Sequence, residues 1–259
     1  MSVLSRVAAA MCLVLPLAAV AGCRGGDDES GTSGPSGTIV VLAASSLTEP
    51  FRALGMAFEA EHPGTTVSFS FAASSDLAAE IESGAPADVF AAASPATMAQ
   101  VSDAGDTAGK PVRFIRDTLE IAVPAGNPAK VSGLADLATK HLTIALCAPK
   151  VPCGAAADKV LAAAKVTPAP DTRDADAAAT LAKVTLGDVD AALVYKTDVI
   201  AAGDKVEGVD FPEAAGAVAE YPIAVLAGAR RPATAQAFVD LVMSAGGQKV
   251  LTEAGFQLP

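Results

Sequence analysis

The stretch VVLAASSLTEP, residues 40–50, runs an apolar segment directly into two serines, Ser45 and Ser46. The apolar part is typical of a buried strand, and apolar residues then recur at helical spacing from Phe51 to Phe58. Hydroxyls at the end of a buried strand need hydrogen-bond partners, because they lose contact with water there. The stretch therefore predicts a strand, a serine junction and a helix, and it raises the question of what the hydroxyls bind.

A second junction of the same kind follows at FAASSDLAAEI, residues 71–81, where Ser74 and Ser75 precede a helical segment. Open α/β sheets bind ligands outside the carboxyl ends of their strands, where helix N-termini offer unpaired N–H groups and a positive dipole end. Two such junctions could surround one small anion with hydroxyl and amide donors. The alternative is that each serine only caps its own helix, since serine is a preferred N-cap residue.

Apolar runs alternate with helical periodicity along the rest of the chain, which is a β-α-β rhythm. The runs are TIVVLAA, TVSFSF, ADVFAAA, TLEIAVPAG, LTIALC, VDAALVY and YPIAVLAG. Continuous apolar strands indicate sheets covered on both faces, so we expect an α/β fold with mostly parallel sheets flanked by helices. The length of 259 residues exceeds that of a typical α/β domain and favours two lobes.

The first residues are expected to form an export signal. Arg6 precedes the apolar stretch VAAAMCLVLPLAAVA, which has signal-peptide length and is short for a membrane span. The small residues of VAGC, directly before Cys23, resemble a bacterial lipoprotein cleavage site. We expect residues 1–22 to be a signal peptide, and the lipid on Cys23 to anchor a flexible polar tether, residues 23–37, to the outer face of the cell membrane. An ordinary secretory signal with a chance cysteine is the alternative.

The composition argues against a nucleic-acid partner and shows that the chain can form a large hydrophobic core. Lysine and arginine number 18 against 29 acidic residues, which gives a net charge of −11. Such a chain offers no basic face to neutralise phosphates, so nucleic acid is not an expected partner. Hydrophobic residues make up 51% of the chain, which is enough for a large core.

Cys147 and Cys153 form a close pair in the segment CAPKVPC. Outside the cytoplasm such a pair is best interpreted as a disulfide, and closing so small a loop would contribute about 2–3 kcal/mol in the chain-entropy model. A metal site is the alternative, but no second Cys or His pair completes four ligands. The two histidines, His62 and His141, each stand beside a segment end and are interpreted as solvated loop residues.

Five segments together resemble the molybdate-binding proteins of bacterial ABC importers, in order over residues 38–259. They are VVLAASSLTEPF, FSFAASSDLAAEIESGAPADVFAAAS, VPCGAAADKVL, DAALVYKTDV and AEYPIAVL. The resemblance implies the two-lobed periplasmic-binding-protein fold of type II, with the ligand in the cleft between the lobes. It implies that lobe 1 comprises residues 38–120 plus 223–259 and that lobe 2 comprises residues 121–222.

The resemblance also implies a set of oxyanion ligands. Ser46 and Ser74 would each use the hydroxyl and the backbone amide, Cys153 and Ala177 would use their amides, and Tyr195 its hydroxyl. Cys153 stands where a small residue such as alanine is expected, which a backbone donor tolerates and which ties the disulfide to the binding loop. No cofactor is implied, and the only metal would be the molybdenum or tungsten of the oxyanion itself.

The function that the resemblance implies is capture of molybdate or tungstate by hinge closure and delivery to an ABC permease and its ATPase, by a monomer. Neutral donors suit a fully deprotonated tetrahedral dianion, whereas phosphate carries a proton near neutral pH and needs an acceptor. Sulfate differs mainly in size, and the sequence does not report the pocket radius, so another small anion such as sulfate is the alternative. Lys150, Arg173 and Lys196 stand beside the motifs, either as solvated rim charges or as groups that steer the anion.

An exported hydrolase with Ser46 or Ser74 as its nucleophile is an alternative from a different class. It needs a base, and neither histidine is near those serines in the sequence. The chain has no G-x-S-x-G elbow, and GDTAGKP has the wrong glycine spacing for a phosphate loop. We therefore expect a binding protein and no enzyme.

Overall fold

The computed structural model of the chain describes residues 34–259. The expected signal peptide, the expected lipid-bearing Cys23 and most of the expected tether lie outside the described residues. Within residues 34–259, no helix is both long and apolar enough to cross a membrane.

The first five-stranded sheet contains strands from both ends of the described chain, in the order β2-β1-β3-β10-β4. The strands are β1 (Gly37–Ala44), β2 (Thr65–Ala72), β3 (Val89–Ala91), β4 (Val112–Asp117) and β10 (Ala219–Val225). Strand β1 pairs in parallel with β2 and β3, whereas β10 runs antiparallel to β3 and β4. We call the part built on this sheet lobe 1.

The second sheet has the same number of strands and is built from the middle of the chain, in the order β7-β6-β8-β5-β9. The strands are β5 (Leu119–Pro124), β6 (Ile144–Cys147), β7 (Thr172–Asp174), β8 (Ala191–Tyr195) and β9 (Val206–Val209). Strand β6 pairs in parallel with β7 and β8, and β5 runs antiparallel to β8 and β9. We call the part built on this sheet lobe 2.

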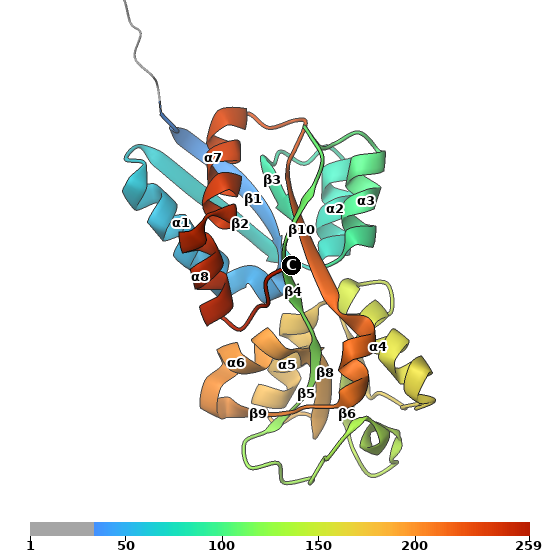
Figure 1. Ribbon diagram of the computed structural model, residues 1–259. Coiled ribbons are helices and arrows are strands. Elements are labelled where there is room, and N and C mark those ends of the chain that lie inside the picture. The colour runs from blue at the N-terminus through green and yellow to red at the C-terminus, as the bar shows by residue number, and fades with distance from the viewer. Residues whose placement is uncertain (1–33) are drawn as a thin grey trace, which may run out of the picture. The chain divides into compact units, whose positions relative to one another are not determined.

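Helices cover both faces of each sheet (Figure 1). In lobe 1 they are α1 (Thr48–Glu61), α2 (Ser74–Glu82), α3 (Pro95–Asp103), α7 (Pro232–Met243) and α8 (Ala245–Glu253). In lobe 2 they are α4 (Pro152–Ala164), α5 (Ala177–Thr185) and α6 (Lys196–Ala202). Adjacent residues of β1 point to opposite faces of the sheet. Val41 belongs to the same buried cluster as Phe51 and Phe238, whereas Leu42 belongs to the buried cluster that contains Leu77 and Met98.

Short 3₁₀ turns complete the element list among the described residues. They are η1 (Ser45–Leu47), η2 (Leu134–Ala138), η3 (Gly203–Lys205) and η4 (Pro212–Ala217). Turn η4 lies on one of the two connections between the sheets, between β9 and β10. The other connection is Thr118, between β4 and β5.

The two-lobed α/β fold is confirmed, but the sheets are mixed rather than mostly parallel. Strands β5 and β10 each run antiparallel to both of their neighbours. A strand covered on both faces is apolar throughout in either direction, so its residue pattern does not report its direction. The lobe boundaries that the sequence suggests, 120/121 and 222/223, stay predictions.

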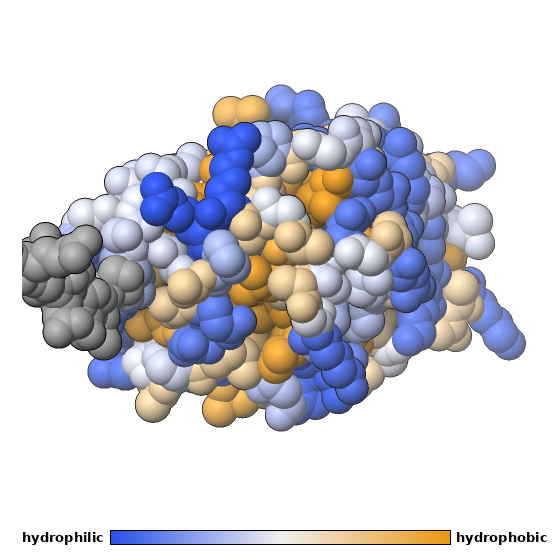
Figure 2. Space-filling view, turned by 90° about the horizontal axis from the view of Figure 1, so that it is seen from above, coloured by the Kyte–Doolittle hydropathy of each residue, from blue (hydrophilic) through white to orange (hydrophobic). Residues whose placement is uncertain are grey.

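On the face that Figure 2 shows, orange and tan residues gather across the middle and blue residues border them. Among the described residues, the large apolar side chains with the highest exposure are Leu186 and Met56, at 74% and 67%. Met56 belongs to α1 of lobe 1, and Leu186 follows α5 of lobe 2.

Candidate functional site

A small cavity lies where the two lobes meet, with a volume of about 10 Å³, close to the minimum for one ordered water. Its walls come from the ends of β1, β2 and β8 and from the first turns of α2, α4 and α5. The lining residues are Ala44, Ser45, Ser46, Ala72, Ala73, Ser74, Ala93, Val151, Pro152, Cys153, Asp176, Ala177 and Tyr195. All five residues that the sequence suggests as oxyanion ligands are in this lining.

The register of one strand pair brings the two serine junctions together. Strands β1 and β2 are parallel and end on the same row, where Ala44 is paired with Ala72. Ser46 then lies in η1, and Ser74 is the first residue of α2. The expected order of strand, serine pair and helix is present at both places, although η1 separates β1 from α1.

Neither serine hydroxyl caps its own helix. The N-cap positions of η1 and α2 are alanines without side-chain hydrogen bonds. The Ser46 hydroxyl instead lies 3.0 Å from the Tyr221 hydroxyl, and the Ser74 hydroxyl accepts a 3.0 Å hydrogen bond from the amide of Ala93. Because Ser74 already accepts a bond, its own proton remains available to a ligand in the cavity.

Lobe 2 contributes the N-termini of α4 and α5. Cys153 is the second residue of α4 and Ala177 is the first residue of α5, so their amides belong to the first turns, which lack intrahelical acceptors. The Asp176 carboxylate caps α5 by accepting a 2.8 Å bond from the amide of Ala179. The positive dipole ends of both helices therefore lie at the cavity.

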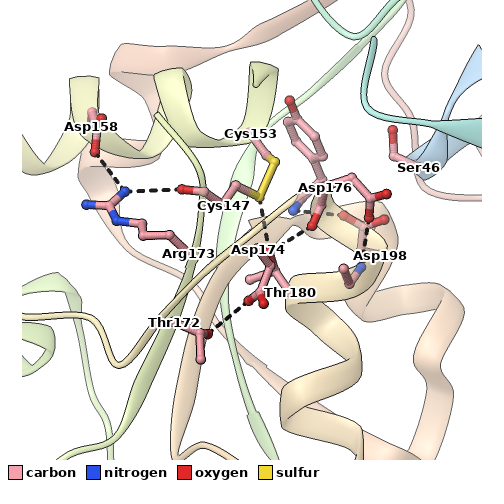
Figure 3. The surroundings of a disulfide bond; sticks show 12 residues. Ser46, Cys147, Cys153, Asp158, Thr172, Arg173, Asp174, Asp176, Thr180 and Asp198 are labelled. Atoms are coloured by element: carbon pink, nitrogen blue, oxygen red, sulfur yellow. Dashed lines mark hydrogen bonds and ion pairs between the residues drawn. A yellow bond between two sulfur atoms is a disulfide. The ribbon is translucent and has the colours of Figure 1, made fainter. Parts of the chain in front are cut away.

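A disulfide joins Cys147, at the end of β6, to Cys153, in the first turn of α4 (Figure 3). The pairing predicted from the sequence is therefore present, with the two Cα atoms 5.8 Å apart. The Thr180 hydroxyl of α5 lies 3.3 Å from the Cys147 sulfur and donates to the carbonyl of Asp176. This network connects the start of α4 to the start of α5.

Glycine is required next to the disulfide. A Cβ atom at Gly154 would lie 1.9 Å from the carbonyl oxygen of Ala148, which is far inside contact distance. Only glycine therefore allows the first turn of α4 to approach the end of β6 this closely.

Tyr195 presents a buried phenol to the cavity from the end of β8. The side chain is 2% exposed, and its hydroxyl has no hydrogen-bond partner among the described residues. Burial, together with the nearby carboxylates of Asp117 and Asp198, raises the pKa of Tyr195 far above its ordinary value. The phenol is therefore neutral and keeps a proton to donate.

Two buried acids, Asp117 and Asp198, lie close to Tyr195. Burial is the main cause that raises the pKa of Asp117 to about 7 and the pKa of Asp198 to about 8. Thr197 donates its hydroxyl proton to Asp117, and Asp198 accepts a 3.1 Å bond from the amide of Tyr195. These two acids were not predicted as part of the site, because nothing in their sequence neighbourhood indicates that they are buried.

Tyr221 was also missed as a neighbour of the site. It lies on β10, its ring centroid is 6.0 Å from that of Tyr195, and its hydroxyl contacts Ser46 across 175 positions of sequence. Burial is the main cause that raises its pKa well above the ordinary value, so it too is neutral. The segment AEYPIAVL, one of those that carry the family resemblance, was the only sequence signal for it.

The lining offers hydrogen-bond donors without a cation. Hydroxyls of Ser46, Ser74 and Tyr195 and first-turn amides of α4 and α5 converge, and none of the described residues in the lining is lysine, arginine or histidine. Within residues 34–259, no group of three metal-ligating side chains occurs. The serine hydroxyls contact Tyr221 and Ala93 rather than a histidine, so no described contact supports the hydrolase alternative. This chemistry suits a small anion.

Two α/β lobes with donors from both at one small cavity define the class of two-lobed binding proteins. The family model described as bacterial extracellular solute-binding protein matches residues 39–257, so the chain belongs to that family. The molybdate-binding protein ModA of Mycobacterium tuberculosis is 41% identical over 246 residues, a match that covers 94% of each chain. The family resemblance stated from the sequence is therefore confirmed.

Solved structures of other proteins share the fold. The periplasmic molybdate-binding protein of Azotobacter vinelandii has a TM-score of 0.70 at 21% identity, covering 85% of this chain and 99% of that one. The sulfate-binding protein SubI of M. tuberculosis has a TM-score of 0.76 at 22% identity, covering 85% and 86%. At these identities the likeness establishes the fold and leaves the choice of ligand open.

Proposed function

We propose that the protein captures molybdate or tungstate outside the cytoplasm and delivers it to an ABC permease and its ATPase. The observation that supports this most is the convergence of uncharged donors from two lobes on one small cavity. A tetrahedral dianion can be held by neutral donors when enough of them converge and water is excluded. The M. tuberculosis relative, which carries the name molybdate-binding protein, supports the choice of ion.

The cavity chemistry disfavours phosphate. Phosphate near neutral pH carries a proton that needs an acceptor at the site. The one carboxylate in the lining, Asp176, uses one oxygen to accept the amide of Ala179, so a single carboxylate oxygen is left to accept that proton among several hydrogen-bond donors. Sulfate has the right charge and remains the second candidate, because SubI, which shares the fold, is named as a sulfate-binding protein.

Closure of the lobes is the proposed functional motion. Ser46 and Ser74 belong to lobe 1, and Cys153, Ala177 and Tyr195 belong to lobe 2, so one ion between these residues would bridge the two lobes. The cavity of about 10 Å³ is close to the size of one water, so the lobes must move apart to admit the ion and close on it again. The lipid on Cys23 would keep the monomer at the membrane surface, where the permease receives the ion.

A thermal-shift series on the purified full-length chain tests the ligand. Molybdate, tungstate, sulfate and phosphate are compared, with a neutral amino-acid mixture as control. An anion at a hundred times its dissociation constant stabilises the fold by about 2.7 kcal/mol, which raises the melting temperature by several degrees. A shift with molybdate and tungstate alone supports the proposal. A shift with sulfate or phosphate instead overturns the choice of ion, and no shift with any anion overturns the oxyanion site.

A further inference from the structure

Two grooves flank the cavity, one on each side. The first, of about 430 Å³, lies between α3 and α4 and shares Tyr195 and Val151 with the cavity wall. The second, of about 610 Å³, lies among α1, α5 and α6 and shares Ser45 and Ser46 with it. Each groove is therefore a candidate route for an anion between solvent and the cavity.

The first groove is lined by two lysines that form no ion pair with any acid of residues 34–259. Lys150, just before α4, and Lys159, two turns into it, line this groove, are exposed, and take part in no ion pair among the described residues. The acid in the same lining, Glu220, is held in a 2.7 Å ion pair with Arg113. The groove therefore carries a local charge of about +2 on a chain whose net charge is −11.

The other two cations beside the sequence motifs are already engaged. Lys196 lies 2.7 Å from Asp210 and 3.3 Å from Glu120. Arg173 pairs with Asp158 at 3.4 Å and donates to the carbonyl of Cys147, on the side of the disulfide away from Ser46 in Figure 3. Neither has its charge free to attract an anion.

The second groove has no comparable excess of positive charge. Lys205 lines it together with the carboxyl groups of Glu49 and Asp198. Glu49 is paired with Arg52 at 3.4 Å. A dianion approaching from this side therefore meets one lysine and a buried acid rather than two free lysines.

We propose that the groove between α3 and α4 is the access route of the anion, and that Lys150 and Lys159 steer the ion into it and raise its association rate. This inference rests on the proposed function. Neither lysine lines the cavity, so neither is expected to contact the bound ion directly. Exposed charges near a binding site act on the rate of association and its salt dependence more than on the bound state.

Stopped-flow kinetics of molybdate binding tests the inference on the full-length chain. The chain has two tyrosines and no tryptophan, and both tyrosines lie at the site, so tyrosine fluorescence follows binding. The test variant is Lys150→Gln/Lys159→Gln. The matched control is Lys110→Gln/Lys205→Gln, which changes the net charge by the same amount as the test variant. Lys110 lines neither groove, and Lys205 lines only the second groove.

At low ionic strength, the test variant is expected to associate roughly threefold to tenfold more slowly than the parent, with an unchanged dissociation rate. The difference should shrink as salt is added, and the control should follow the parent. Equal association rates in the test and control variants overturn the inference, as does a change confined to the dissociation rate. Steering depends on the charge and not on the element, so sulfate replaces molybdate if the parent binds only sulfate. A parent that binds no oxyanion refutes the proposed function, and the inference with it.

Discussion

The hydroxyls of the two candidate serines, Ser46 and Ser74, have different hydrogen-bond partners. Ser74 accepts a bond from the amide of Ala93, which directs its own proton elsewhere. Ser46 shares a contact with the Tyr221 hydroxyl, in which either oxygen can donate. Ser74 is therefore a fixed donor, whereas Ser46 can reorient when an anion arrives.

Ser74→Ala removes one buried donor from the cavity. We expect the affinity for molybdate to fall by about 1–3 kcal/mol, roughly fivefold to 150-fold, without unfolding of the apo protein. Titration calorimetry measures the loss. Ser75→Ala is the matched control, because the neighbouring Ser75 hydroxyl is buried without a described partner and does not line the cavity. Equal affinities of the two variants would remove Ser74 from the site.

Tyr195→Phe separates binding from stability. The Tyr195 hydroxyl is buried and has no partner among the described residues, so its removal takes away a desolvated polar group. We expect the apo protein to unfold at the same or a higher denaturant concentration, while molybdate binds roughly fivefold or more weakly. Denaturant unfolding and calorimetry measure the two quantities. A variant that loses stability but keeps its affinity would show that the hydroxyl is structural.

Because Asp117 and Asp198 are buried, we expect the free energy of unfolding to decrease as the pH rises. Their folded-state pKa values, about 7 and about 8, lie above the ordinary aspartate value of 3.8, so the folded protein binds these protons more tightly than the unfolded chain. The two protonated acids therefore contribute to the free energy of unfolding. This contribution is fully present below about pH 4 and is lost as the pH rises through 7 to 8. Denaturant unfolding at pH 5 and pH 8.5 should give lower stability at pH 8.5, and Asp198→Asn should reduce the difference. Stability that rises between these two values would contradict the assignment.

At the scale of elements, the site depends on how two helices of lobe 2 begin. The disulfide fixes the first turn of α4 against β6, and Thr180 of α5 packs on the Cys147 sulfur. Both amide donors of lobe 2 are therefore positioned by one small network. Its members are buried, since Cys147 is 0% and Thr180 is 0% exposed.

Reduction of the disulfide is expected to weaken molybdate binding. The variant Cys147→Ala/Cys153→Ala keeps the backbone amide at position 153, so any loss of affinity reports positioning rather than a missing donor. We expect its dissociation rate to rise and its stability to fall by about 2–3 kcal/mol. Treatment of the parent with a dithiol reductant should reproduce both effects. Two titratable thiols in the native exported protein, or unchanged affinity of the variant, would contradict this.

The elements that could be predicted from the sequence are those encoded by neighbouring residues. A strand, a serine pair and a helix are read from neighbouring residues, and the close cysteine pair forms the expected bridge. Strand direction is not local information, so the antiparallel placement of β5 and β10 was not predicted. The same holds for the contact between Ser46 and Tyr221, because it depends on how β10 enters the first sheet.

At the scale of the whole molecule, residues from both lobes line the cavity, and each lobe is formed by different parts of the chain. Lobe 1 uses strands from both ends of the described chain, and lobe 2 uses the middle, so two connections join them at Thr118 and between β9 and β10. Residue patterns suggested that the two serine junctions could meet around one anion, and the family resemblance suggested the full set of five residues. The structure brings all five to one cavity, and their role as ligands is the proposal.

The most direct test of the central claim is a crystal structure of the molybdate complex, with the ion located by anomalous scattering at the molybdenum absorption edge. The account predicts one strong peak in the cavity, within hydrogen-bond distance of the Ser46, Ser74 and Tyr195 hydroxyls and of the amides of Cys153 and Ala177. A peak elsewhere, or none in crystals grown with saturating molybdate, would contradict the account.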